Sequence, residues 1–174
     1  TVEKPAISFY GGEPLLNFDL IKRCVEYARQ RFARKVHHNF TTNLTLLSDE
    51  ILDFLVANEV SILVSLDGPK SEHDRHRVYK NGKGTFDRVM DNVERIYQRH
   101  PDYFREHVSF NAVYSPDTDL IAVNDFFTSA PHLFTRQRIN LSGVRRGNQS
   151  FESRCKPNGN QARELLELER RFVQ

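Results

Sequence analysis

Short apolar runs alternate along this chain with longer segments in which apolar residues recur every three or four positions. The short runs have the length and composition of strands, and they cover residues 6–10, 36–41, 60–66, 108–114 and 137–141. A strand followed by a helix, several times over, builds right-handed βαβ units on a parallel sheet. The alternation therefore predicts an α/β fold, either a doubly wound sheet or part of a (β/α) barrel.

Helix-start residues precede four of the periodic segments. Asn17, Ser48 and Thr85 can each cap a helix with the side chain, and Pro116 with Asp117 can start a fourth. The helix after Thr85 has the clearest apolar face, formed by Phe86, Val89, Met90, Val93, Ile96 and Tyr97. Between residues 70 and 84 the sequence is polar and contains two glycines, which predicts a flexible loop.

Composition narrows the class of protein. With 174 residues, 39% hydrophobic and 28% charged, the chain can form one globular domain with its own core. The net charge of +2 does not indicate a nucleic-acid partner, and no apolar run approaches the roughly 20 residues of a membrane-spanning helix. Cys24 and Cys155 form no C-x-x-C pair, so the sequence favours a reducing, cytoplasmic location.

Hydrogen-bonding residues stand at the end of every predicted strand. In chain order they are Gly11-Gly12-Glu13, Thr41-Thr42-Asn43, Ser65 with Asp67, Asn111 with Tyr114, and Asn140 with Ser142. Turn chemistry explains part of this pattern, because Asn, Asp, Ser and Gly favour turns. Since ligands of parallel α/β folds bind at the carboxyl ends of the strands, the pattern also predicts a ligand site on that rim.

Four motifs carry a resemblance to a known family. They are G-G-E-P-L-L from residue 11, F-T-T-N-L-T-L-L from residue 40, V-S-L-D-G-P from residue 64 and H-D-R-H-R from residue 73. Together they resemble the radical S-adenosylmethionine superfamily, in its peptide- and protein-modifying branch with a SPASM-type extension, which includes anaerobic sulfatase maturases and thioether-forming peptide maturases. The resemblance covers residues 7 to about 141. It implies a partial (β/α)6 barrel with strands two to six in residues 1–143, and a linker and terminal helix over residues 144–174 that lead toward a C-terminal extension.

In that family a C-x-x-x-C-x-x-C loop after the first barrel strand binds a 4Fe-4S cluster. This sequence has no such loop, so we expect it to precede Thr1 in a longer protein; a homologue without cluster cysteines is the alternative. Cys155 is a candidate ligand for an auxiliary cluster. His73, Asp74 and His76 lie among arginines, which disfavour a further cation, and we interpret the His-Asp pair as shaping the loop that presents an arginine.

The resemblance assigns roles in binding S-adenosylmethionine to five residues. Gly11, Gly12 and Glu13 match the motif that receives the methionyl ammonium, since glycine lets a ligand approach the backbone and carbonyl and carboxylate oxygens accept its hydrogen bonds. Ser65 matches the ribose-binding serine, and Arg77 matches the arginine whose guanidinium fork holds the methionine carboxylate. We expect Glu13 to point toward the ligand rather than cap the next helix, and one carbonyl of the turn to lack a protein partner.

Three further residues match the family less closely. Asn43 belongs to a T-N motif that glycine usually follows, whereas this chain has Leu44, which leaves the local backbone conformation open. Asn111 and Leu141 correspond to positions near the adenosine end of the cofactor.

The resemblance also implies a reaction and partners. S-adenosylmethionine would be cleaved reductively to a 5′-deoxyadenosyl radical that abstracts hydrogen from a peptide or protein substrate. A low-potential donor such as flavodoxin or ferredoxin would supply the electron, and this chain alone is expected to be inactive. The alternatives are a non-enzymatic α/β binding module, with the basic segment near Arg145 and Arg146 as its interaction surface, and a cluster-independent barrel lyase.

Overall fold

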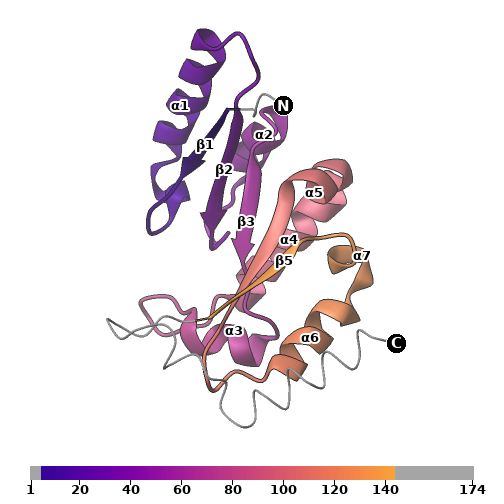
Figure 1. The fold of residues 1–174 in the computed structure, drawn as a ribbon. Helices are drawn as coiled ribbons and strands as arrows, with labels where there is room; N and C mark the ends of the chain where they lie inside the picture. Colours follow the sequence, from indigo (N-terminus) through magenta and orange to yellow (C-terminus); the bar gives the residue numbers. More distant parts are fainter. Residues whose placement is uncertain (1–4, 144–174) are drawn as a thin grey trace, which may run out of the picture. The chain divides into compact units, whose positions relative to one another are not determined.

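The computed structural model describes residues 5–143 (Figure 1). The linker, the terminal helix and the candidate cluster ligand Cys155, which the sequence predicts within residues 144–174, lie outside that range. In chain order the elements are β1 (Ala6–Phe9), the 3-10 helix η1 (Pro14–Asn17), α1 (Phe18–Arg31), β2 (His37–Thr42), α2 (Asp49–Ala57), β3 (Ser61–Ser65), α3 (Lys70–His76), α4 (Phe86–Arg99), α5 (Pro101–His107), β4 (Val108–Tyr114), α6 (Leu120–Ser129), α7 (Pro131–Phe134) and β5 (Ile139–Gly143).

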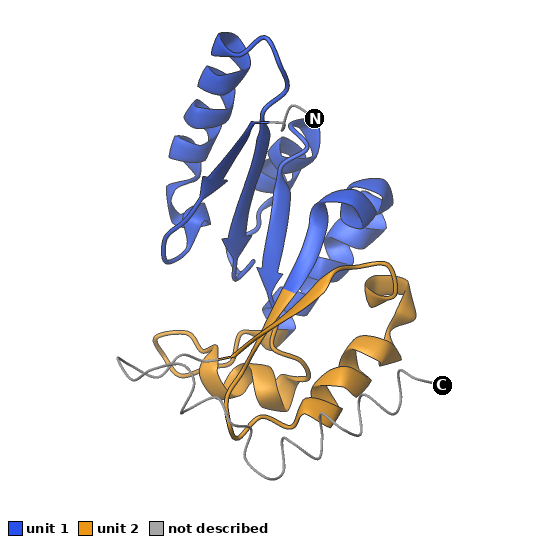
Figure 2. Cartoon of the chain, viewed as in Figure 1, with its two compact units in different colours: residues 1–65, 87–110 blue, residues 66–86, 111–174 orange. Residues whose placement is uncertain are grey.

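The strands follow one another in the sheet in the order β1-β2-β3-β4-β5. β1 pairs with β2 and β2 with β3, both in parallel, as a strand–helix–strand order requires. The predicted parallel α/β fold is confirmed. By its contacts the chain divides into two compact units, residues 1–65 with 87–110 and residues 66–86 with 111–174 (Figure 2).

In the first unit, strand register brings the carboxyl ends of three strands to one edge. Phe9 of β1 pairs with Phe40, and Thr42 pairs with Val64, one residue before the end of β3. Residues that follow these strand ends therefore share one rim, as the sequence predicted for Gly12, Asn43 and Ser65. The core behind them is largely aliphatic, and its side chains at 0% exposure include Leu44, Leu52, Leu55, Val60, Val64, Val89, Val93 and Ile96.

Helix capping follows the predictions in part. The Ser48 hydroxyl accepts a hydrogen bond from the Ile51 N–H at the start of α2, as expected. Asn17 is the N-cap residue of α1, as predicted, but its side chain makes no capping hydrogen bond. α6 begins later than Pro116 and Asp117 suggested, because the Asp119 carboxylate caps it by accepting from the Ala122 N–H at 2.8 Å.

The predicted loop over residues 70–84 is wrong in its first half. Residues Lys70–His76 form α3, and Val78 pairs with Gly84 in an antiparallel bridge that closes the remaining turn. Glu72 and His73 of α3 face the interior of the second unit, and their exposed fractions are 8% and 0%. A helix whose buried residues are glutamate and histidine has no apolar periodicity, and for this reason the sequence pattern did not reveal it.

The sequence pattern also did not predict two short helices. α5 and α7 each begin with a proline in the first turn, at Pro101 and Pro131. Neither is long enough to show a helical period. Within residues 5–143, no helix combines the length and the apolar composition that crossing a lipid bilayer requires.

Candidate functional site

The turn after β1 exposes its backbone. Gly11 has φ +150°, a conformation that side-chain-bearing residues rarely adopt, so glycine is required there. Gly12 shows no such constraint, and a Cβ added at either glycine would meet no atom within 4 Å. Among the hydrogen bonds of the described residues, none reaches the carbonyl of Gly11 or Gly12. The protein itself gives no packing reason for glycine at position 12, and it leaves two carbonyl acceptors open to a ligand.

Glu13 fastens this turn to the end of β2. Its Oε1 accepts from the Leu15 N–H at 3.1 Å and from the Thr42 hydroxyl at 2.8 Å, and its Oε2 accepts from the Asn43 N–H at 2.7 Å. Glu13 is thus the N-cap of η1, and the prediction that it would not cap is wrong. Charge-assisted bonds to nearby backbone donors hold the carboxylate in that position.

Leu44 adopts a left-handed backbone conformation, which glycine adopts more readily than leucine. Its φ is +59°, in the left-handed region that costs a side-chain-bearing residue about 1–2 kcal/mol. Three features hold it there: the side chain is 0% exposed, the N–H donates to the Thr42 hydroxyl at 2.9 Å, and the carbonyl accepts from the Asn92 amide at 2.8 Å. The doubt about this turn is therefore resolved, because burial of leucine stabilises the conformation that glycine adopts freely.

The other two predicted residues of this rim differ in how far the protein uses their side chains. The Asn43 Oδ1 accepts from the Thr45 N–H at 3.0 Å and from the Thr45 hydroxyl at 2.8 Å, a local turn that leaves the amide NH₂ available. Ser65 is the last residue of β3 and is 9% exposed. No hydrogen bond of its hydroxyl occurs among the described residues. Ser65 is therefore the rim side chain least committed to the protein.

In the second unit, Arg77 is held by a carboxylate that the sequence reading had not assigned. The Arg77 Nε and Nη2 donate to the two oxygens of Asp67 at 2.6 and 2.9 Å. Asp67 is 6% exposed, and its Oδ1 also accepts from the Val113 N–H at 2.9 Å. This two-point pairing orients the guanidinium and leaves Nη1 for another partner. The sequence placed Asp67 among the hydrogen-bonding residues at the end of the third predicted strand, but it gave no sign of the pairing with Arg77.

The His73 ring bonds to the backbone of Asp67 and, through Thr85, is connected to the backbone of Arg77. Its Nδ1 accepts from the Asp67 N–H at 3.3 Å, so Nε2 carries the hydrogen and donates to the Thr85 hydroxyl at 3.0 Å. Thr85 in turn donates to the Arg77 carbonyl at 3.0 Å. Burial lowers the pKa of His73 to about 4, which keeps the imidazole neutral as this chain of bonds requires.

Asp74 follows His73 in α3 and connects this helix to the start of α4. Its Oδ1 accepts from the Phe86 N–H at the start of α4 at 2.9 Å, and its Oδ2 pairs with Lys70 at 3.0 Å. A Cβ at Gly84 would overlap this carboxylate, so glycine is needed there for close approach. With both nitrogens of His73 and the carboxylate of Asp74 engaged, no group of three metal-ligating side chains exists within the part of the chain that the structure describes.

Asn111 and Leu141 lie on β4 and β5 of the second unit. The Asn111 Oδ1 accepts from the Ser142 hydroxyl at 2.9 Å. Leu141 is 54% exposed and lines an apolar cavity of about 660 Å³ together with Tyr114, Leu120, Phe127 and Phe134. The side-chain oxygen of Asn111 is thus already bonded to β5, whereas the exposed side chain of Leu141 offers an apolar contact in the cavity.

Comparison with known proteins decides the family. The sequence profile of the Radical SAM superfamily matches residues 2–121. The chain belongs to the radical SAM superfamily. This radical SAM chain is 32% identical over 136 residues to the serine-type anaerobic sulfatase-maturating enzyme of Bacteroides thetaiotaomicron, covering 75% of this chain and 29% of that enzyme. It is 26% identical over 113 residues to the radical SAM cyclopropyl synthase TigE of Paramaledivibacter caminithermalis, covering 65% of this chain and 22% of the synthase.

A solved structure shows the same fold. Native anSMEcpe with bound AdoMet and Cp18Cys peptide matches the radical SAM chain with a TM-score of 0.70 at 21% identity, covering 85% of this chain and 42% of that one. The predicted partial-barrel type of α/β fold is confirmed by this match. The chain spans less than a third of the length of the two curated relatives named above.

Proposed function

We propose that this chain is the S-adenosylmethionine-binding part of a radical SAM enzyme that modifies a peptide or protein. The observation that carries the proposal is the open turn at Gly11-Gly12, which lies on the carboxyl rim and has two carbonyls without a protein partner among the described residues. Relatives that mature sulfatases, and a structural neighbour with a bound peptide, support a peptide or protein substrate.

In this proposal, each residue would bind a different part of the cofactor. The free carbonyls of Gly11 and Gly12 would accept hydrogen bonds from the methionyl ammonium, and Glu13 would hold the turn in place for them. The Ser65 hydroxyl would serve a ribose hydroxyl, and the Arg77 guanidinium would face the methionine carboxylate. Asn43 supports the rim, and Asn111 with Leu141 remain proposals for the adenosine end.

An iron–sulfur cluster does not fit the described residues, which contain no set of three metal-ligating side chains. The proposal therefore takes the cluster ligands from outside residues 5–143. With such a cluster, S-adenosylmethionine supplies the radical chemistry, and a low-potential protein such as flavodoxin or ferredoxin supplies the electron. The protein's own contribution is to bind and orient the cofactor.

The Gly12→Ala variant tests the proposal directly. We expect the free energy of unfolding to stay the same or rise slightly, because the added Cβ meets no atom within 4 Å. We expect the affinity for S-adenosylmethionine to fall about tenfold, because the Cβ occupies the approach to a carbonyl acceptor. Calorimetric titration of the full-length, cluster-loaded protein measures the affinity, and urea unfolding measures the stability. Unchanged affinity in a fully folded Gly12→Ala variant would contradict the proposal.

The Arg77→Ala variant tests the carboxylate contact. Loss of one charge-assisted hydrogen bond costs about 1.5–3 kcal/mol, so the affinity for S-adenosylmethionine should fall roughly 10- to 150-fold. Arg75→Ala is the matched control, since Arg75 lies two residues earlier and binds Glu72 and the Asp117 carbonyl instead of Asp67. If both variants bind the cofactor as tightly as the wild type, Arg77 has no role in binding it.

A further inference from the structure

Asp67 is held in place by contacts other than its ion pair. Its carboxylate accepts from the Val113 N–H of β4 at 2.9 Å, and its own N–H donates to His73 Nδ1 at 3.3 Å. The next residue, Gly68, has φ +117°, and a Cβ there would lie 2.8 Å from Val123 Cγ2, so this turn packs directly on α6. The carboxylate therefore has a fixed position that does not depend on the cation it binds.

Arg77 depends on Asp67 for the direction of its side chain. The backbone of Arg77 is fixed separately, since its N–H donates to the His73 carbonyl at 3.0 Å and its carbonyl accepts from the N–H and the hydroxyl of Thr85 at 3.1 and 3.0 Å. The guanidinium, in contrast, has Asp67 as its only hydrogen-bonding partner within residues 5–143. Because a guanidinium stands at the end of a long chain with many rotamers, this one carboxylate determines where it lies.

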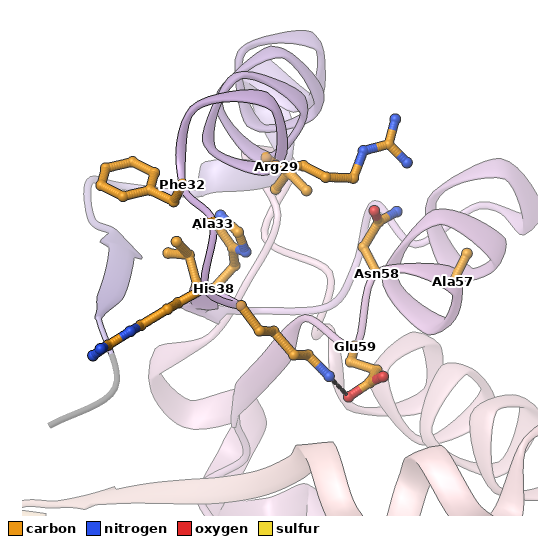
Figure 3. A pocket seen from close by; sticks show the side chains of 11 residues that line it. Arg29, Phe32, Ala33, His38, Ala57, Asn58 and Glu59 are labelled. Atoms are coloured by element: carbon orange, nitrogen blue, oxygen red, sulfur yellow. Dashed lines mark hydrogen bonds and ion pairs between the residues drawn. The ribbon is translucent and has the colours of Figure 1, made fainter. Parts of the chain in front are cut away.

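The Asp67–Arg77 pair differs from the exposed ion pairs of the chain. Lys35 and Glu59, which line a cavity of about 350 Å³ in the first unit, pair through side chains that are 57% and 53% exposed (Figure 3). Water screens such a pair, which fixes little. The side chains of Arg77 and Asp67 are 25% and 7% exposed and meet at two points, at 2.6 and 2.9 Å. Two charge-assisted bonds side by side set both the position and the plane of the guanidinium.

The pairing leaves one edge of the Arg77 guanidinium unused. Of the five N–H donors of an arginine, Asp67 takes the Nε–H and one N–H of Nη2. The donors that remain are both N–H groups of Nη1 and the second one of Nη2, and two of these lie side by side at the end of the planar fork. Because a quarter of the side chain is exposed, the pair does not seal this edge from a ligand. Two parallel donors match the two oxygens of a second carboxylate.

We propose that Asp67 is a positioning residue that holds Arg77 with this free edge available to the carboxylate of S-adenosylmethionine. This role rests on the proposed function, which assigns the carboxylate contact to Arg77. Asp67 itself touches no part of the cofactor. Its contribution is preorganisation, because the guanidinium loses its rotamer freedom in the folded protein rather than on binding. The negative charge of Asp67 opposes the attraction between Arg77 and the ligand, but solvent around a partly exposed guanidinium screens that opposition.

Calorimetric titration of S-adenosylmethionine into the full-length, cluster-loaded protein tests this role. Asp67→Asn removes the charge and the two-point pairing but keeps an oxygen that can accept from the Val113 N–H. We expect the affinity to fall about fivefold, less than in Arg77→Ala, because the arginine is still present and only its preorganisation is lost. Glu72→Gln is the matched control and should bind as the wild type does, since Glu72 is also buried, at 8% exposure, but pairs with Arg75 at 3.2 Å.

A double-mutant cycle separates positioning from a purely structural role. If Asp67 acts through Arg77, Asp67→Asn should cause no further loss of affinity in the Arg77→Ala background, whereas a structural role would cost the same in both backgrounds. Wild-type affinity in Asp67→Asn, with weakened binding in Arg77→Ala, would overturn the positioning role and leave the proposed function standing. Wild-type affinity in Arg77→Ala would contradict both. The same loss in Asp67→Asn and Glu72→Gln, or the same loss in both backgrounds, would also rule out positioning.

Discussion

Acidification from about pH 6.5 to pH 4 will lower the free energy of unfolding by about 3 kcal/mol through His73 alone. The unfolded chain binds a proton at His73 near its ordinary pKa of 6.5, whereas burial holds the folded pKa at about 4. Between these values the unfolded state binds more protons, so stability falls as the pH falls. The contribution of His73 is fully present above the unfolded pKa.

Urea unfolding at a series of pH values between 7 and about 4 measures this effect. The His73→Gln variant is the matched control, because a glutamine can accept from the Asp67 N–H and donate to the Thr85 hydroxyl without titrating. The wild type should lose stability faster than the variant across this range. Parallel pH profiles for the two proteins would show that His73 does not titrate as its burial predicts.

The Gly84→Ala variant should lose about 2 kcal/mol of stability. The added Cβ would overlap the Asp74 carboxylate, which must then give up its hydrogen bond to the Phe86 N–H and its pairing with Lys70. Loss of a capping carboxylate costs about 0.5–2 kcal/mol, and the displaced backbone adds to that. Chemical unfolding of the single variant measures the total.

A double-mutant cycle with Asp74→Ala isolates the cause. Without the carboxylate, the Cβ of Ala at position 84 has room, so Gly84→Ala should then cost much less than in the wild type. The same cost in both backgrounds would mean that Asp74 is not what requires glycine at position 84. Asp74 lies between His73 and Arg77 in the chain. A displaced Asp74 in the Gly84→Ala variant should therefore also disturb the Asp67–Arg77 pair.

Local patterns were enough to predict the strands and the principal helices. β4 has the predicted bounds, and the other strands are shifted by one or two residues at their ends, because apolar runs and turn residues mark strand ends from nearby sequence alone. The glycines of the first turn and the hydroxyl cap of α2 are also local features. The family resemblance of the four motifs needed no structure either, and the match over residues 2–121 confirms it.

Only the tertiary structure could decide which partner each polar residue has. Glu13 bonds to Thr42, 29 residues away, and Asp67 to the Val113 N–H, 46 residues away, so neither role is visible in local sequence. Leu44 adopts a left-handed backbone because the surrounding core buries its side chain, against its own conformational preference. His38 and His73 are both buried histidines, and only the fold shows that one has two hydrogen-bond partners while the Nε2 of the other has none. The sequence thus determines the backbone pattern, whereas long-range packing determines which side chains are left free to bind a ligand.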